Sequence, residues 1–271
     1  SRVFKVTMED NSVYAAKLYP GPTADGQNRM TAEFTALDFL RQKDINCVPR
    51  PIVSDPSRQC AVYEFVEGAD VDSSDATTAD IDQTCRFLLQ LNELKNDPES
   101  VRLPDAAESC FSIQAIVSNL ESRLVQLQNA KGSSPWFGEL QGYLATEFVP
   151  TFRGFVSWCR TRATSAGMAV DTELSQENRT LSPSDFGFHN CLRRSNGQLA
   201  FLDFEYFGWD DPAKTISDFL LHPAMALSSD SKMRFTANML GLLKTDRLLS
   251  ERVETVFPLF GLKWCLIFHK T

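Results

Sequence analysis

The stretch Ser184-Asp185-Phe186-Gly187-Phe188-His189-Asn190, followed by Phe201-Leu202-Asp203-Phe204-Glu205, decides how the rest of the chain is interpreted. It places a carboxylate and a carboxamide five positions apart, and a second carboxylate thirteen positions after the Asn. Between them, Asn196-Gly197 is a strong signal for the two-residue turn of a hairpin. Because this hairpin would bring Asn190 and Asp203 side by side, we expect these two residues to share a metal ion.

The three polar side chains have the chemistry that phosphoryl transfer requires. Asp185, placed on a loop, is the candidate base that accepts the proton of an incoming hydroxyl. Asn190 and Asp203 offer the oxygen ligands that Mg²⁺ prefers. Asp and Asn also stabilise turns by bonding to their own backbone, so either residue alone would be structural. The combination with the hairpin favours a phosphotransfer site.

A cation is expected upstream, in the predicted hairpin of residues 2–19. Ala15 and Lys17 share one face of its return strand, so Ala15 could cover an adenine ring while Lys17 reaches the phosphates. Glu33, near the start of a helix predicted for residues 31–41, could pair with Lys17 and hold it extended. The plain alternatives are a solvent-facing strand Lys and a surface helix Glu.

The strand predicted for residues 61–66 ends in a candidate hinge. The backbone groups of Glu64, Phe65 and Val66 could bind the edge of the adenine, although the same residues also fit an ordinary core strand.

An acidic and aromatic cluster follows Asp203. Glu205, Tyr206 and Trp209 could line an acceptor pocket, since an acid and ring faces suit an ammonium group. Core packing is the plainer interpretation of the aromatic residues. Asp211-Pro212 is interpreted as a turn, Asp218 as a helix cap or loop brace, and His189 as a loop-packing residue.

The composition narrows the class of protein. The chain has 271 residues, 43% of them hydrophobic and 23% charged, which is typical of a globular protein. A net charge of −8 argues against nucleic-acid binding and is compatible with a cationic small substrate. The chain has seven Cys, an odd number, with no C-x-x-C pair, and only three His, so a structural zinc site is not expected. The scattered Cys favour reduced thiols in a cytoplasmic protein. No signal peptide and no apolar run near 18 residues is present, so no membrane span is expected. Nothing indicates the oligomeric state.

The order of predicted elements is a strand-rich front followed by helices. A polar loop is expected at residues 23–29, and a break at residues 131–135. Helices are predicted from Thr78 to about residue 94 and from Ser112, each capped by the residue named. Further helical segments are predicted at residues 137–165, 218–227, 231–248 and 252–268.

These motifs resemble the aminoglycoside phosphotransferase and choline kinase superfamily, the small-molecule branch of the protein-kinase-like fold. Lys17, in Tyr14-Ala15-Ala16-Lys17, resembles the family's Lys, and Glu33 resembles the family's helix Glu. The segment Leu202-Asp203-Phe204-Glu205-Tyr206 is similar to the corresponding segment of choline kinases. The resemblance implies an α+β, bilobal kinase, with a small β-rich N-lobe carrying one helix (residues 1–68) and a larger, mainly helical C-lobe (residues 69–271). It also implies transfer of a phosphoryl group from ATP or GTP, with Mg²⁺, to a hydroxyl of a sugar, amino alcohol or aminoglycoside-like molecule.

The chain departs from the family pattern in two places. Pro183 stands where the family has a His that braces the loop. The Gly-rich loop that covers the phosphates would precede Val3, so we expect that residues are missing at one or both ends. Two alternatives therefore remain beside the kinase: a pseudokinase that binds nucleotide or acts as a scaffold, and a metal-dependent phosphatase that uses Asp203 and Glu205.

Overall fold

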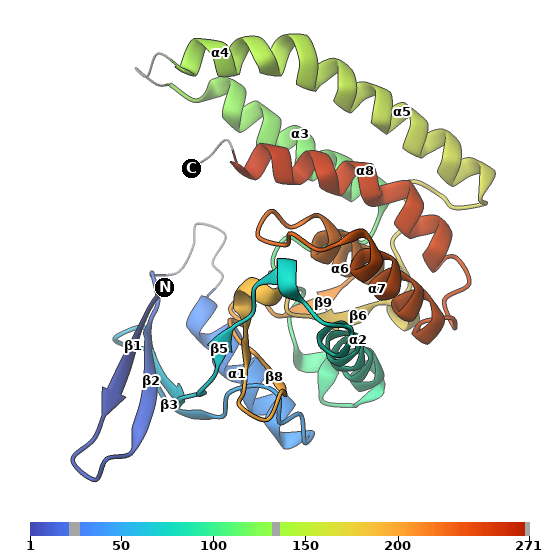
Figure 1. Cartoon of the computed structure of the whole chain (residues 1–271). Helices are drawn as coiled ribbons and strands as arrows, with labels where there is room; N and C mark the ends of the chain where they lie inside the picture. The colour runs from blue at the N-terminus through green and yellow to red at the C-terminus, as the bar shows by residue number, and fades with distance from the viewer. Residues whose placement is uncertain (22–27, 132–135, 269–271) are drawn as a thin grey trace. The chain divides into compact units, whose positions relative to one another are not determined.

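The computed structural model describes residues 1–21, 28–131 and 136–268, and its chain begins with a four-stranded antiparallel sheet in the order β1-β2-β4-β3 (Figure 1). The strands are β1 (Arg2–Thr7), β2 (Val13–Leu18), β3 (Pro51–Asp55) and β4 (Cys60–Glu64). The predicted hairpin of residues 2–19 is confirmed, because β1 pairs with β2 in register from Arg2 opposite Leu18 to Thr7 opposite Val13.

One helix, α1 (Arg29–Gln42), packs beside β3 and β4. The Asn28 side chain caps it by accepting a hydrogen bond from the Thr31 backbone N–H at 3.0 Å. Its buried residues are Met30, Glu33, Ala36, Leu37, Phe39 and Leu40. Glu33 is the charged member of this otherwise apolar group, so the helix carries one carboxylate into the interior. The predicted helix at residues 31–41 is confirmed, and the loop predicted just before it lies mostly outside the described residues.

The hairpin predicted around Asn196-Gly197 is confirmed. Strands β7 (Cys191–Arg193) and β8 (Leu199–Phe201) pair antiparallel, and β5 (Ala69–Asp70) joins β7 to make a three-stranded sheet. The turn closes because Gly197 adopts a φ of 80° and the Arg194 N–H donates to the Gln198 carbonyl at 2.8 Å.

A cluster of aromatic rings lies beneath this hairpin. Phe87, on α2 (Thr78–Glu93), stacks on Phe201 with centroids 4.5 Å apart, and Phe186 lies 5.3 Å from the same ring. The edge of Phe204 meets Phe87 at 6.2 Å. All four side chains are buried. Because Phe186 follows Asp185 and Phe204 follows Asp203, the cluster fixes the backbone beside both predicted site residues.

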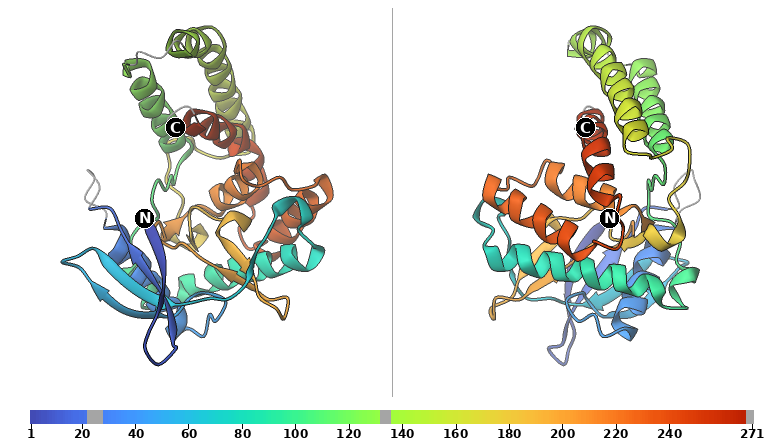
Figure 2. Two further views of the ribbon diagram at one scale, coloured as in Figure 1. Left: turned by 60° about the vertical axis from the view of Figure 1, so that its left-hand side comes forward. Right: turned by 90° about the vertical axis from the view of Figure 1, so that its right-hand side faces the viewer.

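The same compact unit contains two further elements. Helix α7 (Ser229–Leu242) runs along α2 (Figure 2), and Arg234 on α7 makes two hydrogen bonds to Asp82 on α2. Strands β6 (Thr180–Ser182) and β9 (Gly208–Asp210), which precede and follow the predicted site in the sequence, pair antiparallel with each other. The unit comprises residues 1–109, 179–210 and 224–242.

A second compact unit comprises residues 110–178, 211–223 and 243–271, and its described part is helical. Its main helices are α3 (Ile113–Asn129), α4 (Trp136–Tyr143), α5 (Val149–Ser165), α6 (Pro212–Leu221) and α8 (Leu249–Phe268), with a π-helical turn at Leu144–Phe148. Helix α8 packs against α3, α5 and α6. Ser112 caps α3 as predicted, whereas the predicted break lies mostly outside the described residues. The units do not divide at residue 68, and the lobe boundary there stays a prediction.

Some predicted helix ends are wrong. The helix placed at residues 218–227 is α6, which begins at Pro212 and ends at Leu221. The Asp211 side chain accepts a hydrogen bond from the Ala213 N–H at 2.8 Å, so Asp211-Pro212 starts a helix rather than making a separate turn. Asp218 therefore lies inside α6, where the Trp264 indole N–H donates to it at 3.0 Å.

Three other boundaries also differ from the predictions. Thr77, and not Thr78, caps α2, because its side chain and that of Asp80 exchange hydrogen bonds with each other's backbone N–H. Helix α7 ends at Leu242 instead of residue 248, and α8 starts at Leu249 instead of residue 252.

None of the helices in the described part of the chain combines the length and the apolar character needed to cross a membrane.

Candidate active site

Lys17 lies at the centre of a cluster of carboxylates. Its Nζ is 2.6 Å from Glu33 Oε2, 2.6 Å from Asp203 Oδ1 and 3.3 Å from Glu205 Oε2. The ammonium group has three donors, so each carboxylate can take one of them. Lys17 is 5% exposed, which rejects the solvent-facing alternative for this residue. The structure thus brings the upstream cation to the downstream acid, across 186 positions of sequence.

The charges of this cluster act on one another. Burial alone lowers the pKa of the Lys17 ammonium, but the carboxylates of Glu33 and Asp203 outweigh it and raise the pKa above its ordinary value. Lys17 therefore stays positively charged throughout the physiological range. Burial raises the pKa of the Glu33 carboxyl against the attraction of Lys17. A buried carboxylate of this kind depends on its partners to stay ionised.

Glu33 joins three parts of the unit through hydrogen bonds. Its Oε2 accepts the Tyr19 hydroxyl at 2.6 Å as well as the Lys17 ammonium, and its Oε1 accepts the Phe204 backbone N–H at 3.1 Å. The Tyr19 hydroxyl is in turn 2.7 Å from that of Tyr63. Glu33 is 3% exposed, so it is an interior residue and not the surface helix Glu of the plain alternative. It holds α1, β2 and the backbone just after Asp203 in one arrangement.

Glu205 continues the ionic network away from Lys17. Its Oε1 accepts a hydrogen bond from Arg29 Nη1 at 3.1 Å, and the Arg29 guanidinium lies over the Tyr206 ring, 4.9 Å from its centroid. Burial alone raises the pKa of the Glu205 carboxyl, but the charges of Lys17 and Arg29 outweigh it and hold the pKa below its ordinary value. Arg29 was not predicted as a site residue, because a single Arg at a helix start carries no motif.

A cavity of about 330 Å³ opens beside this pair. It is lined by the first turns of α1, by residues of the segment 102–107, and by Glu205, Tyr206 and Phe207. Trp209 is not among the lining residues: it is 4% exposed, and its indole N–H donates to the Ser100 carbonyl at 3.1 Å. Of the three predicted acceptor residues, two therefore border a cavity and the third is a core residue. The role of Glu205 and Tyr206 toward an acceptor stays a prediction, whereas the prediction for Trp209 is wrong because its side chain is buried in the core.

The loop that carries Asp185 is held in a tight turn. The Asp185 N–H donates to the Pro183 carbonyl at 3.0 Å, and Ser184 between them has a φ of 68°. Such a γ-turn is uncommon for a residue other than glycine, and the surroundings have to hold it in place. The Ser184 hydroxyl does so by donating to the Ala107 carbonyl at 3.0 Å, while the Ser184 N–H donates to Ser182 Oγ at 3.1 Å. The Asp185 side chain is 37% exposed.

Asn190 is oriented by the same loop. Its Nδ2 donates to the Asp185 backbone carbonyl at 3.0 Å, which fixes the plane of the carboxamide. The Asn190 carbonyl accepts the Leu202 N–H at 2.8 Å, so the hairpin sets Asn190 beside the residue that precedes Asp203. Asp203 itself has a φ of 64°, and its side chain is 35% exposed.

The donor set fits a hard divalent cation. Asp203 and Asn190 present oxygen atoms on adjacent segments, and carboxylate oxygens of Glu33, Asp203 and Glu205 lie within 4.8 Å of one another. Oxygen donors of this kind are the ligands that Mg²⁺ takes in nucleotide sites. Asp203 is the most accessible of the three carboxylates, and the assignment of the metal to Asp203 and Asn190 stays a prediction.

The family model described as "Phosphotransferase enzyme family" matches residues 1–239. The chain belongs to the phosphotransferase enzyme family. It is accordingly a small-molecule kinase, and the resemblance drawn from the sequence is confirmed. A search of curated protein sequences gives no match.

Solved structures share the fold of this phosphotransferase. An ethanolamine kinase from Plasmodium vivax is 16% identical with a TM-score of 0.63, covering 97% of this chain and 71% of its own. A choline kinase from Streptococcus pneumoniae is 16% identical with a TM-score of 0.60, covering 99% and 82%. An aminoglycoside phosphotransferase from Streptomyces rimosus, solved with ADP and streptomycin, is 16% identical with a TM-score of 0.55, covering 97% and 92%. The α+β protein-kinase-like fold class is confirmed.

The residues predicted to contact adenine lie at the sheet and just after it. Ala15 on β2 is paired with Tyr63 on β4, and the Glu64 N–H donates to the Arg50 carbonyl at 2.8 Å. Lys5 on β1 lies over the Phe65 ring, 4.5 Å from its centroid. Val66 is 7% exposed. Their contacts with a nucleotide stay predictions for this phosphotransferase.

Replacing Glu205 with Gln is expected to reduce the stability at pH 7 by about 1–3 kcal/mol, the usual worth of a hydrogen bond between charged groups. Because the pKa of Glu205 is lowered by folding, its contribution is fully present above the ordinary value of 4.5 and is lost as the pH falls through the folded value. The difference between wild type and Glu205→Gln in urea unfolding should therefore be constant from pH 7 to about pH 5 and shrink as the pH falls below 4.5. Glu9→Gln, at an exposed position, is the control. A difference that stays constant from pH 7 to about pH 3 would contradict the assignment.

Proposed function

We propose that this phosphotransferase moves the γ-phosphoryl group of ATP or GTP to a hydroxyl of a small molecule, with Asp185 as base and with Mg²⁺ held by Asn190 and Asp203. The observation that supports it most is the buried contact of Lys17 with both Glu33 and Asp203. Phosphoryl transfer depends on positioning and on neutralising charge, and this contact supports the proposal because it joins a buried cation to the acid that we propose as a metal ligand.

The steps assign one task to each residue. Asp185 takes the proton as the acceptor O–H bond breaks, and the acceptor oxygen forms a bond to the γ-phosphorus. The bond from this phosphorus to the bridging oxygen breaks, and the nucleoside diphosphate leaves. Lys17, held by Glu33, would bind phosphate oxygens, and Asp203 and Asn190 would hold the metal. Mg²⁺, when bound, neutralises charge on the phosphates.

The acceptor class follows from the charge around the site. Glu205 and Tyr206 border the cavity beside the network, and both already contact the Arg29 guanidinium. An acceptor with an amine would therefore bind the acid and the ring by taking the place of this guanidinium. We propose amino alcohols and aminoglycosides first, and sugars next. The kinases with the same fold include enzymes named for ethanolamine and choline, and one solved with streptomycin.

We further propose a cytoplasmic location, which the seven free cysteines support. The pseudokinase alternative gains no support from the family match, and the phosphatase alternative leaves the contact of Lys17 with Glu33 unexplained.

The test is nucleotide consumption over a panel of hydroxylated compounds. Choline, ethanolamine, streptomycin and a set of hexoses are each mixed with the protein and with ATP or GTP, in Mg²⁺ and in EDTA. With at least one of these compounds the protein should consume nucleotide in Mg²⁺, and with none of them should it consume nucleotide in EDTA. A parallel thermal-shift screen should show stabilisation by Mg-nucleotide, since a ligand at 100 times its dissociation constant adds about 2.7 kcal/mol. Absence of both consumption and stabilisation would contradict the proposal.

A further inference from the structure

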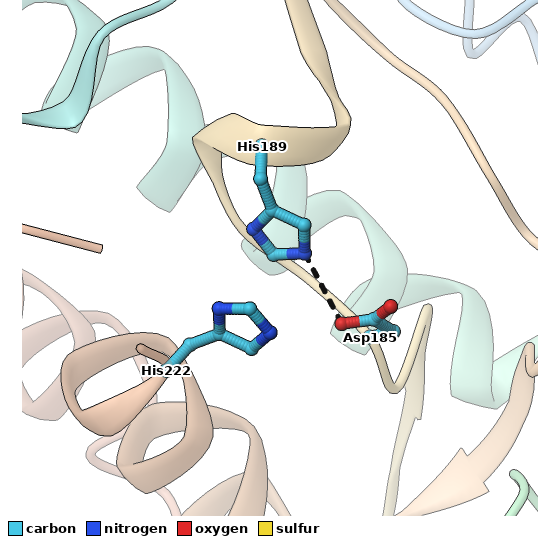
Figure 3. A group of neighbouring side chains, drawn as sticks. All are labelled: Asp185, His189 and His222. Atoms are coloured by element: carbon cyan, nitrogen blue, oxygen red, sulfur yellow. Dashed lines mark hydrogen bonds and ion pairs between the residues drawn. The ribbon is translucent and has the colours of Figure 1, made fainter. Parts of the chain in front are cut away.

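His189 lies four positions after Asp185 and makes a direct contact with it. The His189 Nε2 atom is 3.1 Å from Asp185 Oδ1, as the dashed line in Figure 3 shows. (His222, also drawn there, belongs to the second compact unit.) The His189 side chain is 20% exposed and the Asp185 side chain 37%. The sequence alone favoured loop packing for His189, whereas the structure gives it a polar partner.

The position of the His189 ring is fixed by Gly187. A Cβ atom at residue 187 would lie 2.7 Å from His189 Nδ1, 2.8 Å from His189 Cε1 and 2.9 Å from Met225 Sδ. The ring therefore rests on the bare Gly187 backbone, and any larger residue would push it away. Gly187 is needed here for its lack of a side chain, since its φ of 173° is ordinary extended backbone.

The backbone of His189 is fixed on both sides. The Phe188 N–H contacts Met225 Sδ at 3.1 Å, and the Asn190 N–H donates to the Gly187 carbonyl at 3.1 Å, closing a single 3₁₀ turn at Phe188–Asn190. Strand β7 follows directly at Cys191. The ring is thus held by rigid neighbours, which is what a group that orients another side chain needs.

We propose that His189 is a positioning residue for the Asp185 carboxylate. By donating its Nε2–H to Oδ1, it stops the carboxylate from rotating and sets the direction in which Asp185 meets the acceptor hydroxyl. The inference rests on the proposed function, in which Asp185 is the base. His189 acts through Asp185, and proton transfer needs the base at hydrogen-bond distance with the correct orientation.

The test is a double-mutant cycle with Asp185→Asn. His189→Leu keeps similar bulk but has no donor, and it should lower kcat by about 10- to 100-fold, part of the effect of general-base catalysis. The KM for Mg-ATP should change less than about threefold. His189→Gln, which restores an N–H donor, should recover most of the loss. In the Asp185→Asn background, His189→Leu should change the residual kcat less than about twofold, because coupled residues are not additive.

Two further measurements and one further variant make the test independent of the acceptor and of folding. Single-turnover hydrolysis of Mg-ATP, with water as acceptor, is measured beside the best acceptor of the panel. Gly187→Ala retains the imidazole but displaces it, so it should lower kcat to a similar degree as His189→Leu. The chain has three His, so imidazole NMR spectra resolve His189, whose signals should shift in Asp185→Asn.

The outcomes separate two kinds of failure. If His189→Leu lowers kcat equally in the wild-type and Asp185→Asn backgrounds, or leaves wild-type kcat unchanged, the positioning role is wrong while the base remains. If Asp185→Asn itself turns over at the wild-type rate, the proposed base is wrong. Unmoved His189 resonances in Asp185→Asn would show that the contact does not form.

Discussion

Asp185→Asn is expected to lower kcat by about 10²- to 10⁴-fold, the range that general-base catalysis supplies. The carboxamide has the shape of the carboxylate but does not accept the acceptor proton. The bond from Asn190 Nδ2 goes to the Asp185 backbone carbonyl, so it survives the substitution. The dissociation constant of Mg-nucleotide, measured by calorimetric titration, should therefore stay within about twofold of the wild-type value while kcat falls.

A matched control is available on α1. Asp38 is exposed, and Asp38→Asn changes the same chemical group away from the site, so its kcat should equal that of the wild type. Wild-type turnover in Asp185→Asn would remove the base assignment. A joint loss of turnover and nucleotide affinity would show instead that the residue organises the metal site.

Asp203→Asn should abolish the Mg²⁺ dependence of nucleotide binding. Asp203 is the accessible carboxylate of the cluster, and an amide is a weaker ligand for Mg²⁺ than a carboxylate. We expect the dissociation constant in Mg²⁺ to rise at least about 100-fold, or about 2.7 kcal/mol. In EDTA the affinity should not fall, because the substitution removes a negative charge that faces the phosphates.

The fold should tolerate this change. Lys17 retains its contacts with Glu33 and Glu205, and the oxygen of a carboxamide at residue 203 can still accept a hydrogen bond from the Lys17 ammonium. The melting temperature of Asp203→Asn without ligands should therefore match that of Asp38→Asn closely. A nucleotide affinity that still rises with Mg²⁺ in Asp203→Asn would refute the metal assignment.

Local chemistry was enough to predict several elements. The hairpin turn depends on Gly197, which adopts a left-handed φ at the end of a three-residue loop (residues 195–197) instead of the two-residue turn predicted. The Ser112 cap depends on one side chain and a nearby N–H. For α6 the signal was present but misread, since an Asp followed by Pro marks a helix start as well as a turn.

The site was only partly predictable for a different reason. Lys17, Glu33 and Asp203 were expected to meet, because each resembles a known motif, and the structure places them in contact. The contact of Arg29 with Glu205, and that of His189 with Asp185, depend on how distant or turned segments pack. No periodicity or cap encodes such contacts, so they emerge only from the assembled chain.

The contact between Lys17 and Asp203 also has a consequence for how the chain matures. The unit that holds both residues is interrupted by residues 110–178, and the two partners are 186 positions apart. During synthesis, Lys17 and Glu33 emerge long before Asp203 and Glu205, so Lys17 at first lacks two of its three carboxylate partners. Contacts of such long sequence separation form slowly. Nucleotide binding should therefore be the last property to appear during refolding, well after helical structure has returned.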